Sequence, residues 1–255
     1  MNVTARVFGI SALALSSLVP SVVTAQDPSA HEIVDRAQKA LWGATTSEVL
    51  LTMTVTTPRW ERTLELRGWN DRPRRTFIRI LAPAKEEGIG SLRIGSEMWN
   101  YLPNIERTIR IPPSMMLQPW MGSDFTNDDL VKQNSLVDDY THSIVGSDTV
   151  DGAAVHVIDA LPKPDAAVVW GRIAFRIRQA DFLPVSEEFY DERGSLVRVL
   201  TFSEIRPLGG RTIPTRWEMR STTKPGNATT IVMESATFDA AIPDDVFTQR
   251  NLSRR

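Results

Sequence analysis

The amino-acid sequence predicts an α+β protein that is mainly β and is built on one large, strongly curved antiparallel sheet. Apolar and polar residues alternate with a period of two over most of the chain, and turn residues separate the alternating runs. Such alternation indicates strands with one buried and one solvated face, which favours antiparallel pairing. A meander of roughly ten to twelve short strands must curl because sheet twist accumulates. We therefore expect helices inside or across a curved sheet.

Composition excludes several classes of protein. The chain has 255 residues, 42% of them hydrophobic and 24% charged, with a net charge of −2. It is too apolar for a disordered chain and too evenly charged for a nucleic-acid-binding domain. It has no cysteine, which excludes disulfides, thiol nucleophiles and a lipoprotein acylation site. With only three histidines, we predict no metal site and no cofactor.

Residues 1–25 are predicted to be a cleaved secretory signal peptide. Arg6 is the only charge, an apolar stretch follows, and Val23-Thr24-Ala25 supplies an A-x-A-like cleavage site. The apolar stretch is shorter than the roughly 20 residues that span a bilayer, which argues against a membrane anchor. Gln26 stands where a lipoprotein signal would need cysteine. Residues 26–255 are therefore expected to form one exported, soluble, non-lipidated domain.

A helix is predicted directly after the signal peptide. Ser29 and Glu32 have the spacing of a capping box, and Gly43 ends the pattern. Between them, one face of the helix collects apolar residues at helical spacing, namely Ile33, Val34, Ala37 and Leu41. We expect this helix to pack on the sheet.

The strands follow from residue 48 onward. The alternating runs are residues 48–56, 64–67, 75–80, 105–111, 172–178, 196–202, 213–219 and 229–238. Glycine and proline lie between the runs, as expected for tight turns.

Residues 112–140 interrupt the strand pattern. They contain the densest cluster of soft apolar residues in the chain, made by Met115, Met116, Leu117, Trp120, Met121 and Phe125. Thr126, followed by Asp128 and Asp129, has the composition of a helix start. The pattern predicts an insertion of one or two short helices between an N-terminal and a C-terminal half of the sheet. The cluster either fills the core or forms a movable lid with an adaptable apolar surface.

No motif in the sequence predicts catalysis. It lacks G-x-S-x-G, H-E-x-x-H, P-loop and kinase patterns. Adjacent acids such as Glu187 and Glu188 would point to opposite faces of a strand, so they are poor candidates for a catalytic pair. An exported hydrolase stays a minor alternative, since a glycosidase would need two carboxylates across a cleft.

The first half of the chain is locally basic. Its arginines can be solvated and protect sheet edges, or they can form a rim that contacts headgroup phosphates or an acidic partner. The candidates for such contacts are Arg93, Arg107 and Arg110.

Several motifs resemble a known family. They are GSLRIG at 90–95, EMWNYLP at 97–103, RTIRI at 107–111, Met115-Met116, WMGSDFTNDDL at 120–130, and Phe247-Thr248. The sequence resembles the outer membrane lipoprotein-sorting proteins, a branch of the periplasmic lipoprotein carrier (LolA/LolB-like) superfamily. The resemblance covers nearly the whole mature chain.

The resemblance implies an incomplete antiparallel β-barrel of about eleven strands, with helices lidding a hydrophobic cavity for acyl chains. It implies a periplasmic, non-enzymatic carrier that binds the acyl chains of lipoproteins or lipids and delivers them toward the outer membrane. An inner-membrane transporter is a further candidate partner, because members of this branch often accompany efflux-type or lipid-exporting transporters. The alternative is a periplasmic accessory of such a transporter that binds no cargo itself.

The acyl-binding candidates combine the lid cluster with two aromatic residues of the preceding strand. They are Trp99, Tyr101, Met115, Met116, Leu117, Trp120, Met121 and Phe125.

Overall fold

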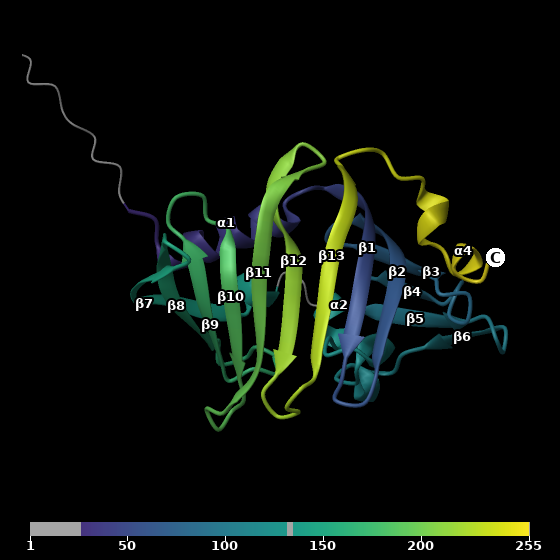
Figure 1. Cartoon of the computed structure of the whole chain (residues 1–255), viewed down its shortest axis with the longest axis horizontal. Coiled ribbons are helices and arrows are strands. Elements are labelled where there is room, and N and C mark those ends of the chain that lie inside the picture. Colours follow the sequence, from purple (N-terminus) through teal and green to yellow (C-terminus); the bar gives the residue numbers. More distant parts are fainter. Residues whose placement is uncertain (1–26, 132–134, 255) are drawn as a thin grey trace, which may run out of the picture.

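The computed structural model describes residues 27–131 and 135–254 (Figure 1). The predicted signal peptide, residues 1–25, lies outside the described residues.

Within the described residues, thirteen antiparallel strands form a single curved sheet (Figure 1). The strands of the N-terminal half are β1 (Thr46–Thr56), β2 (Glu61–Asp71), β3 (Arg75–Ala82), β4 (Gly90–Ile94), β5 (Glu97–Leu102) and β6 (Arg107–Arg110). Those of the C-terminal half are β7 (Tyr140–Val150), β8 (Ala153–Pro162), β9 (Arg172–Arg178), β10 (Pro184–Tyr190), β11 (Leu196–Leu208), β12 (Arg211–Ser221) and β13 (Ala228–Phe238). The predicted fold class is confirmed, although the sheet has more strands than the expected number of about eleven.

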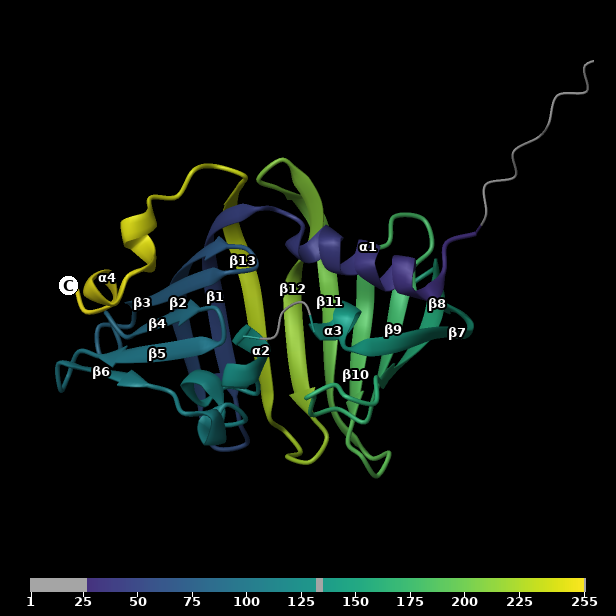
Figure 2. The ribbon, with the colours of Figure 1, turned by 180° about the vertical axis from the view of Figure 1, so that it is seen from behind.

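The sheet consists of two meanders joined in the middle. Its strand order is β6-β5-β4-β3-β2-β1-β13-β12-β11-β10-β9-β8-β7, so β1 pairs with β13 and the edge strands are β6 and β7. These edges are consecutive in the chain. The described residues of the connection between them, 111–131 and 135–139, are here called the crossover segment and lie over the concave face of the sheet (Figure 2).

The described residues of the crossover segment contain four short helices, where one or two were expected. They are the 3-10 helices η1 (Pro113–Met115) and η2 (Trp120–Gly122) and the α-helices α2 (Asn127–Val131) and α3 (Ser135–Asp138). The predicted helix start is confirmed: Thr126 N and Oγ1 donate to Asp129 Oδ2 at 2.8 and 2.9 Å, and Asp129 N donates to Thr126 Oγ1 at 3.3 Å.

Helix α1 (Ala30–Trp42) begins and ends where the sequence predicts. Ser29 accepts from Glu32 N, the Glu32 side chain accepts from Ser29 N, and Gly43 is the C-cap. The helix lies across the concave side of the C-terminal half (Figure 2). Its buried residues, including Ile33 and Leu41, share one apolar cluster with strands β8 to β13.

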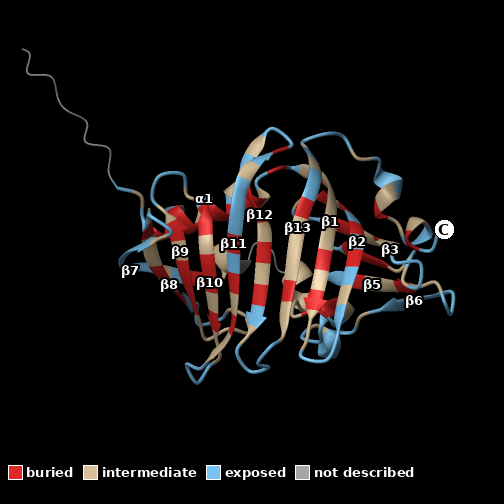
Figure 3. Ribbon diagram, viewed as in Figure 1, coloured by how far each residue is buried: buried red, intermediate tan, exposed pale blue. Residues whose placement is uncertain are grey.

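The N-terminal half of the sheet has apolar clusters on both faces. Met53, Leu64 and Leu66 on the concave face pack with Trp120 of the crossover segment. On the other face, a second cluster is covered by the C-terminal helices η3 (Asp244–Phe247) and α4 (Gln249–Leu252). Buried and partly exposed residues alternate along most strands (Figure 3).

Candidate functional site

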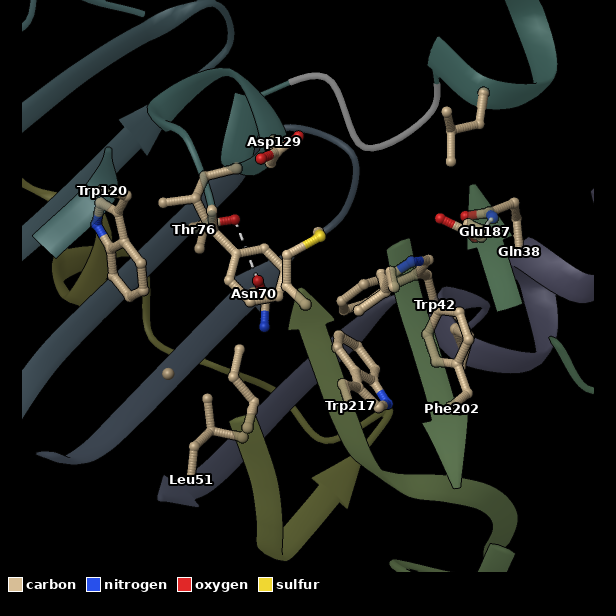
Figure 4. A pocket seen from close by; sticks show the side chains of 18 of the residues that line it. Gln38, Trp42, Leu51, Asn70, Thr76, Trp120, Asp129, Glu187, Phe202 and Trp217 are labelled. Carbon is tan, nitrogen blue, oxygen red and sulfur yellow. Dashed lines mark hydrogen bonds between the residues drawn. The ribbon is translucent and has the colours of Figure 1, made fainter. Parts of the chain in front are cut away.

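A cavity of about 230 Å³ lies between the concave face of the sheet, α1 and the crossover segment. Figure 4 shows side chains from several elements converging on it. Because side chains two apart in a strand share a face, β1 supplies residues 49, 51 and 53, and β2 supplies residues 66, 68 and 70. Most of the lining is apolar and includes Leu51, Met53, Leu66, Phe202, Trp217, Met219, Ile231 and Met233. Below, β1–β6 with the turns between them are called the N-terminal wall, and β7–β13 with the turns between them the C-terminal wall.

Among the residues that the structure describes, Arg198 of β11 is the arginine that the C-terminal wall presents to the cavity, and its charge is neutralised. Its Nη1 and Nη2 donate to the two carboxylate oxygens of Asp129 at 2.8 and 2.6 Å. The guanidinium also lies over the rings of Trp170 and Phe189, 4.6 Å from each centroid. Since Asp129 belongs to α2, this ion pair fixes the crossover segment to the sheet. A bidentate arginine–carboxylate pair is among the stronger polar contacts in proteins.

A buried carboxyl group lies on the same wall. Glu187 Oε1 accepts from Gln38 Nε2 of α1 at 3.1 Å (Figure 4). Burial raises the pKa of Glu187 to about 7, against the opposing effects of the Gln38 hydrogen bond and the Arg198 charge. Its neighbour Glu188 instead contacts Arg176 and Tyr190. The two glutamates thus lie in different surroundings, as the sequence predicts for neighbours in a strand.

The N-terminal wall carries a chain of polar side chains. Asn70 Nδ2 donates to Ser47 Oγ at 3.1 Å, and Thr76 Oγ1 donates to Asn70 Oδ1 at 3.1 Å (Figure 4). Arg93 Nη2 donates to Thr76 Oγ1 at 3.2 Å. Ser47, Asn70 and Thr76 all line the cavity. The chain therefore links the buried charge of Arg93 to polar groups at the cavity wall.

Arg72 lies beside this chain and also lines the cavity. Its guanidinium stacks on Trp42 of α1, 4.1 Å from the ring centroid, and its buried Nη2 has no hydrogen-bond partner. Burial, and then the nearby charge of Arg93, lower the pKa of Arg72 to about 9, so the group stays charged at neutral pH. Arg72 was not among the sequence candidates. Arg72 follows the last residue of β2, in the turn to β3, so the alternation of β2 does not extend to it.

Polar contacts also hold the crossover segment to the N-terminal wall and to β13. Trp120 Nε1 donates to Ser91 Oγ of β4 at 3.0 Å. Thr229 Oγ1 of β13 donates to Asp124 Oδ2 at 2.8 Å and accepts from Asp124 N at 2.9 Å. Together with the Asp129 contact, these interactions fasten the segment over the cavity.

Two of the eight acyl-binding candidates, Trp120 and Phe125, line the cavity. Trp120 is also part of the packed core, with only 4% of its surface exposed. Met116 and Met121 are half-buried, and Met121 packs against the cluster around Met53.

The other candidates lie outside this cavity's lining. Met115 and Leu117 are exposed, at 46% and 54%. Trp99 and Tyr101 pack with Phe247 and Leu252 in the cluster on the opposite face of the sheet. Their position follows from the alternation of β5, in which Met98 takes the concave side.

The three arginines predicted to contact headgroups differ in exposure. Arg93 is buried and donates to Pro73 O at 2.9 Å, to Gly95 O at 3.2 Å and to Thr76, so it is not part of an exposed rim. Arg107 is exposed on the edge strand β6. Arg110, also exposed, hydrogen-bonds to Glu97 of β5.

Two further features concern metals and membranes. In residues 27–131 and 135–254, no three His, Asp or Glu side chains are grouped closely enough to hold a metal ion. The same part of the chain has no helix with the length and apolarity to cross a membrane.

The described residues therefore form an open, curved antiparallel sheet with a covered apolar cavity on its concave side. A family profile described as "Uncharacterized protein" matches residues 72–254, and the chain belongs to that family. No curated protein matches the sequence.

Solved structures with the same fold include three bacterial proteins. A DUF1329 family protein from Desulfovibrio piger is 22% identical with a TM-score of 0.79, over 88% of this chain and 97% of that one. A putative outer membrane lipoprotein-sorting protein domain from Vibrio parahaemolyticus is 20% identical with a TM-score of 0.75, over 88% and 98%. A LolA superfamily protein from Nitrosomonas europaea is 20% identical with a TM-score of 0.73, over 88% and 99%. The resemblance to lipoprotein-sorting proteins is thus confirmed in the fold.

Proposed function

We propose that the protein is a periplasmic carrier that holds an acyl chain of a lipid or lipoprotein in its cavity and delivers it toward the outer membrane. The observation that carries this proposal is the covered cavity, whose lining is mostly aliphatic and aromatic. The predicted signal peptide and the shared fold support it. Binding is non-covalent, and no enzymatic step is proposed.

The energetics of acyl transfer fit such a site. Each methylene hidden from water contributes about 0.8 kcal/mol, so a long chain does not cross an aqueous space unaided at a useful rate. The cavity volume of about 230 Å³ lies below the roughly 300–1,000 Å³ of pockets for drug-sized ligands. One chain suits this space, whereas larger cargo requires the crossover segment to move.

The crossover segment is proposed to act as the lid. Trp120 and Phe125 would contact the chain from above, whereas Met115, Met116, Leu117 and Met121 would give the outer part of the lid an adaptable apolar surface. Trp99 and Tyr101 are not proposed as part of the lid, because they lie on the other face of the sheet.

A cavity-filling substitution tests the proposal. The mature chain is mixed with dodecanoate or with dodecanol, and complexes are detected by native mass spectrometry. We expect both to bind, and Leu51→Trp to weaken both about tenfold, the loss of contact with about two methylenes. Thr52→Trp is the matched control, because Thr52 is the next residue of β1 and bonds to Glu234 rather than lining the cavity.

The results that would overturn the proposal are equally specific. Failure of the unaltered chain to bind either compound contradicts it and favours the alternative of a transporter accessory without cargo. Equal binding by the Leu51→Trp and Thr52→Trp variants places the acyl chain elsewhere and also contradicts it.

A further inference from the structure

The arginine side chains near the cavity differ in how their charge is satisfied. Eight buried side-chain nitrogens of the described residues lack a hydrogen-bond partner, and they belong to seven arginines and one histidine. Arg62, Arg79 and Arg211 each donate to a backbone carbonyl through another nitrogen. Within the described residues, Arg72 is the member of this group whose side chain has neither a hydrogen bond nor an ion pair.

In the part of the chain that the structure describes, no carboxylate forms an ion pair with Arg72. The adjacent carboxylate, Asp71, accepts from Arg75 Nε and Nη2 at 2.8 and 2.6 Å and lies 3.7 Å from Arg74 Nη2. The polar chain beside Arg72 consists of neutral side chains and the cationic Arg93. A buried polar group without a partner is costly, and such a group in a native protein calls for an explanation.

The position of Arg72 supplies that explanation. Arg72 lines the cavity, and its guanidinium is held against Trp42. A guanidinium presents a planar fork of donors that matches carboxylate and phosphate oxygens. In an apolar cavity this contact is stronger than in water, because the local dielectric constant is low.

We propose that Arg72 binds the anionic headgroup, a carboxylate or a phosphate, of a single-chain amphiphile whose tail lies along the apolar lining of the cavity. Asn70, two residues before Arg72 and near the end of β2, also lines the cavity and would lie next to the headgroup. This inference rests on the proposed carrier function and narrows its cargo to molecules with one acyl chain and one terminal anion.

Ligands that differ only in the headgroup test the proposal. Affinities of the mature chain for dodecanoate, dodecyl phosphate and dodecanol are measured by isothermal titration calorimetry at neutral pH. We expect at least one anion to bind about tenfold more tightly than the alcohol, as for a hydrogen bond to a charged group. The stronger of the two anions identifies the headgroup as a carboxylate or a phosphate.

Substitutions of Arg72 test whether this residue causes the preference for anions over the alcohol. Arg72→Met should bring the ratio of anion to alcohol affinity close to one while leaving alcohol binding intact, and Arg72→Lys should keep part of the preference. Arg74→Met is the matched control, because Arg74 is an exposed neighbour that lies near Asp71. It should leave the ratio unchanged.

A second measurement uses the unaltered chain. Dodecanoate labelled with carbon-13 at its carboxyl is titrated by NMR in the complex. A carboxylate held by Arg72 should have a pKa below that of the free acid, whereas a carboxyl buried without a cation should have a raised pKa.

Three outcomes separate the proposals. Equal affinity of the unaltered chain for alcohol and anions, or a raised carboxyl pKa in the complex, overturns the headgroup site and leaves the carrier intact. Retention of the anion preference in Arg72→Met also overturns it. Absence of binding by all three compounds overturns the carrier function itself.

Discussion

Within residues 27–131 and 135–254, each wall of the cavity presents one arginine to it, and the charges of these two arginines are satisfied in different ways. Both guanidinium groups lie over aromatic rings, Arg198 at 4.6 Å from Trp170 and Phe189, and Arg72 at 4.1 Å from Trp42. Arg198 has a bidentate carboxylate partner, whereas Arg72 has none. The comparison indicates that the C-terminal wall uses its charge to hold the crossover segment, while the N-terminal wall leaves a charge available to a ligand.

The largest effect on stability is expected from removing the carboxylate partner of Arg198, which leaves its charge unpaired like that of Arg72. Asp129→Asn removes the counter-charge of Arg198, whose side chain is only 6% exposed, and weakens the start of α2. We expect the free energy of unfolding to fall by about 3 kcal/mol, as for other buried ion pairs that lose one partner. Urea denaturation measures it.

A double variant provides the control for this prediction. Adding Arg198→Met to Asp129→Asn removes the isolated charge and should restore part of the lost stability. If Asp129→Asn costs less than about 1 kcal/mol, Arg198 does not depend on its partner and the contrast between the walls is wrong.

A slightly smaller effect is expected from Glu187, and it depends on pH. Because the pKa of Glu187 is raised to about 7 in the fold, its protonated form stabilises the protein below pH about 4.5, and this contribution is lost as pH rises through about 7. Glu187→Gln keeps a neutral side chain at all pH values. The variant should therefore be more stable than the unaltered protein at pH 8.5, by up to about 3 kcal/mol, with little difference at pH 4.5.

Glu188 is the matched control for Glu187. Its hydrogen bonds from Tyr190 and Arg176 lower its pKa against the opposing effect of burial. Glu188→Gln should therefore lower stability at neutral pH, the opposite sign to Glu187→Gln. Urea titrations of both variants at the two pH values should diverge, and parallel curves would contradict the assignment.

The smallest effect is expected at Arg72. Without ligand, Arg72→Met should raise the free energy of unfolding by about 1 kcal/mol, because it replaces a partly buried, unpartnered charge with an apolar side chain. Arg74→Met should change stability by less than about 0.5 kcal/mol. A destabilisation of Arg72→Met comparable to that of Asp129→Asn would show that Arg72 supports the fold, as Arg198 does.

Sequence patterns predicted best those elements that are determined by interactions between residues close together in the chain. The boundaries of α1 follow from Ser29, Glu32 and Gly43, which act within one turn of the helix. Strand β4 was not recognised by alternation because four of its five residues are buried. The pairing of β1 with β13 joins segments far apart in the chain, and nothing local specifies it.

The site was predictable only in part, because contacts between segments far apart in the chain also determine which residues line it. Composition located the crossover segment and two of its cavity residues, Trp120 and Phe125. Trp99 and Tyr101 lie on the face of the sheet opposite the cavity, and a shift of one residue in a strand is enough to reverse the face. Arg72 could not be distinguished from the neighbouring arginines, because the presence of a counter-charge is decided by tertiary contacts.

The route of the crossover segment has a mechanical consequence. It connects β6 and β7, the two edge strands of one curved sheet, and lies over the open side of that sheet. A flatter sheet would place β6 and β7 farther apart. We therefore expect the sheet to open wider only when the contacts of Trp120 and Asp129 with the sheet are released.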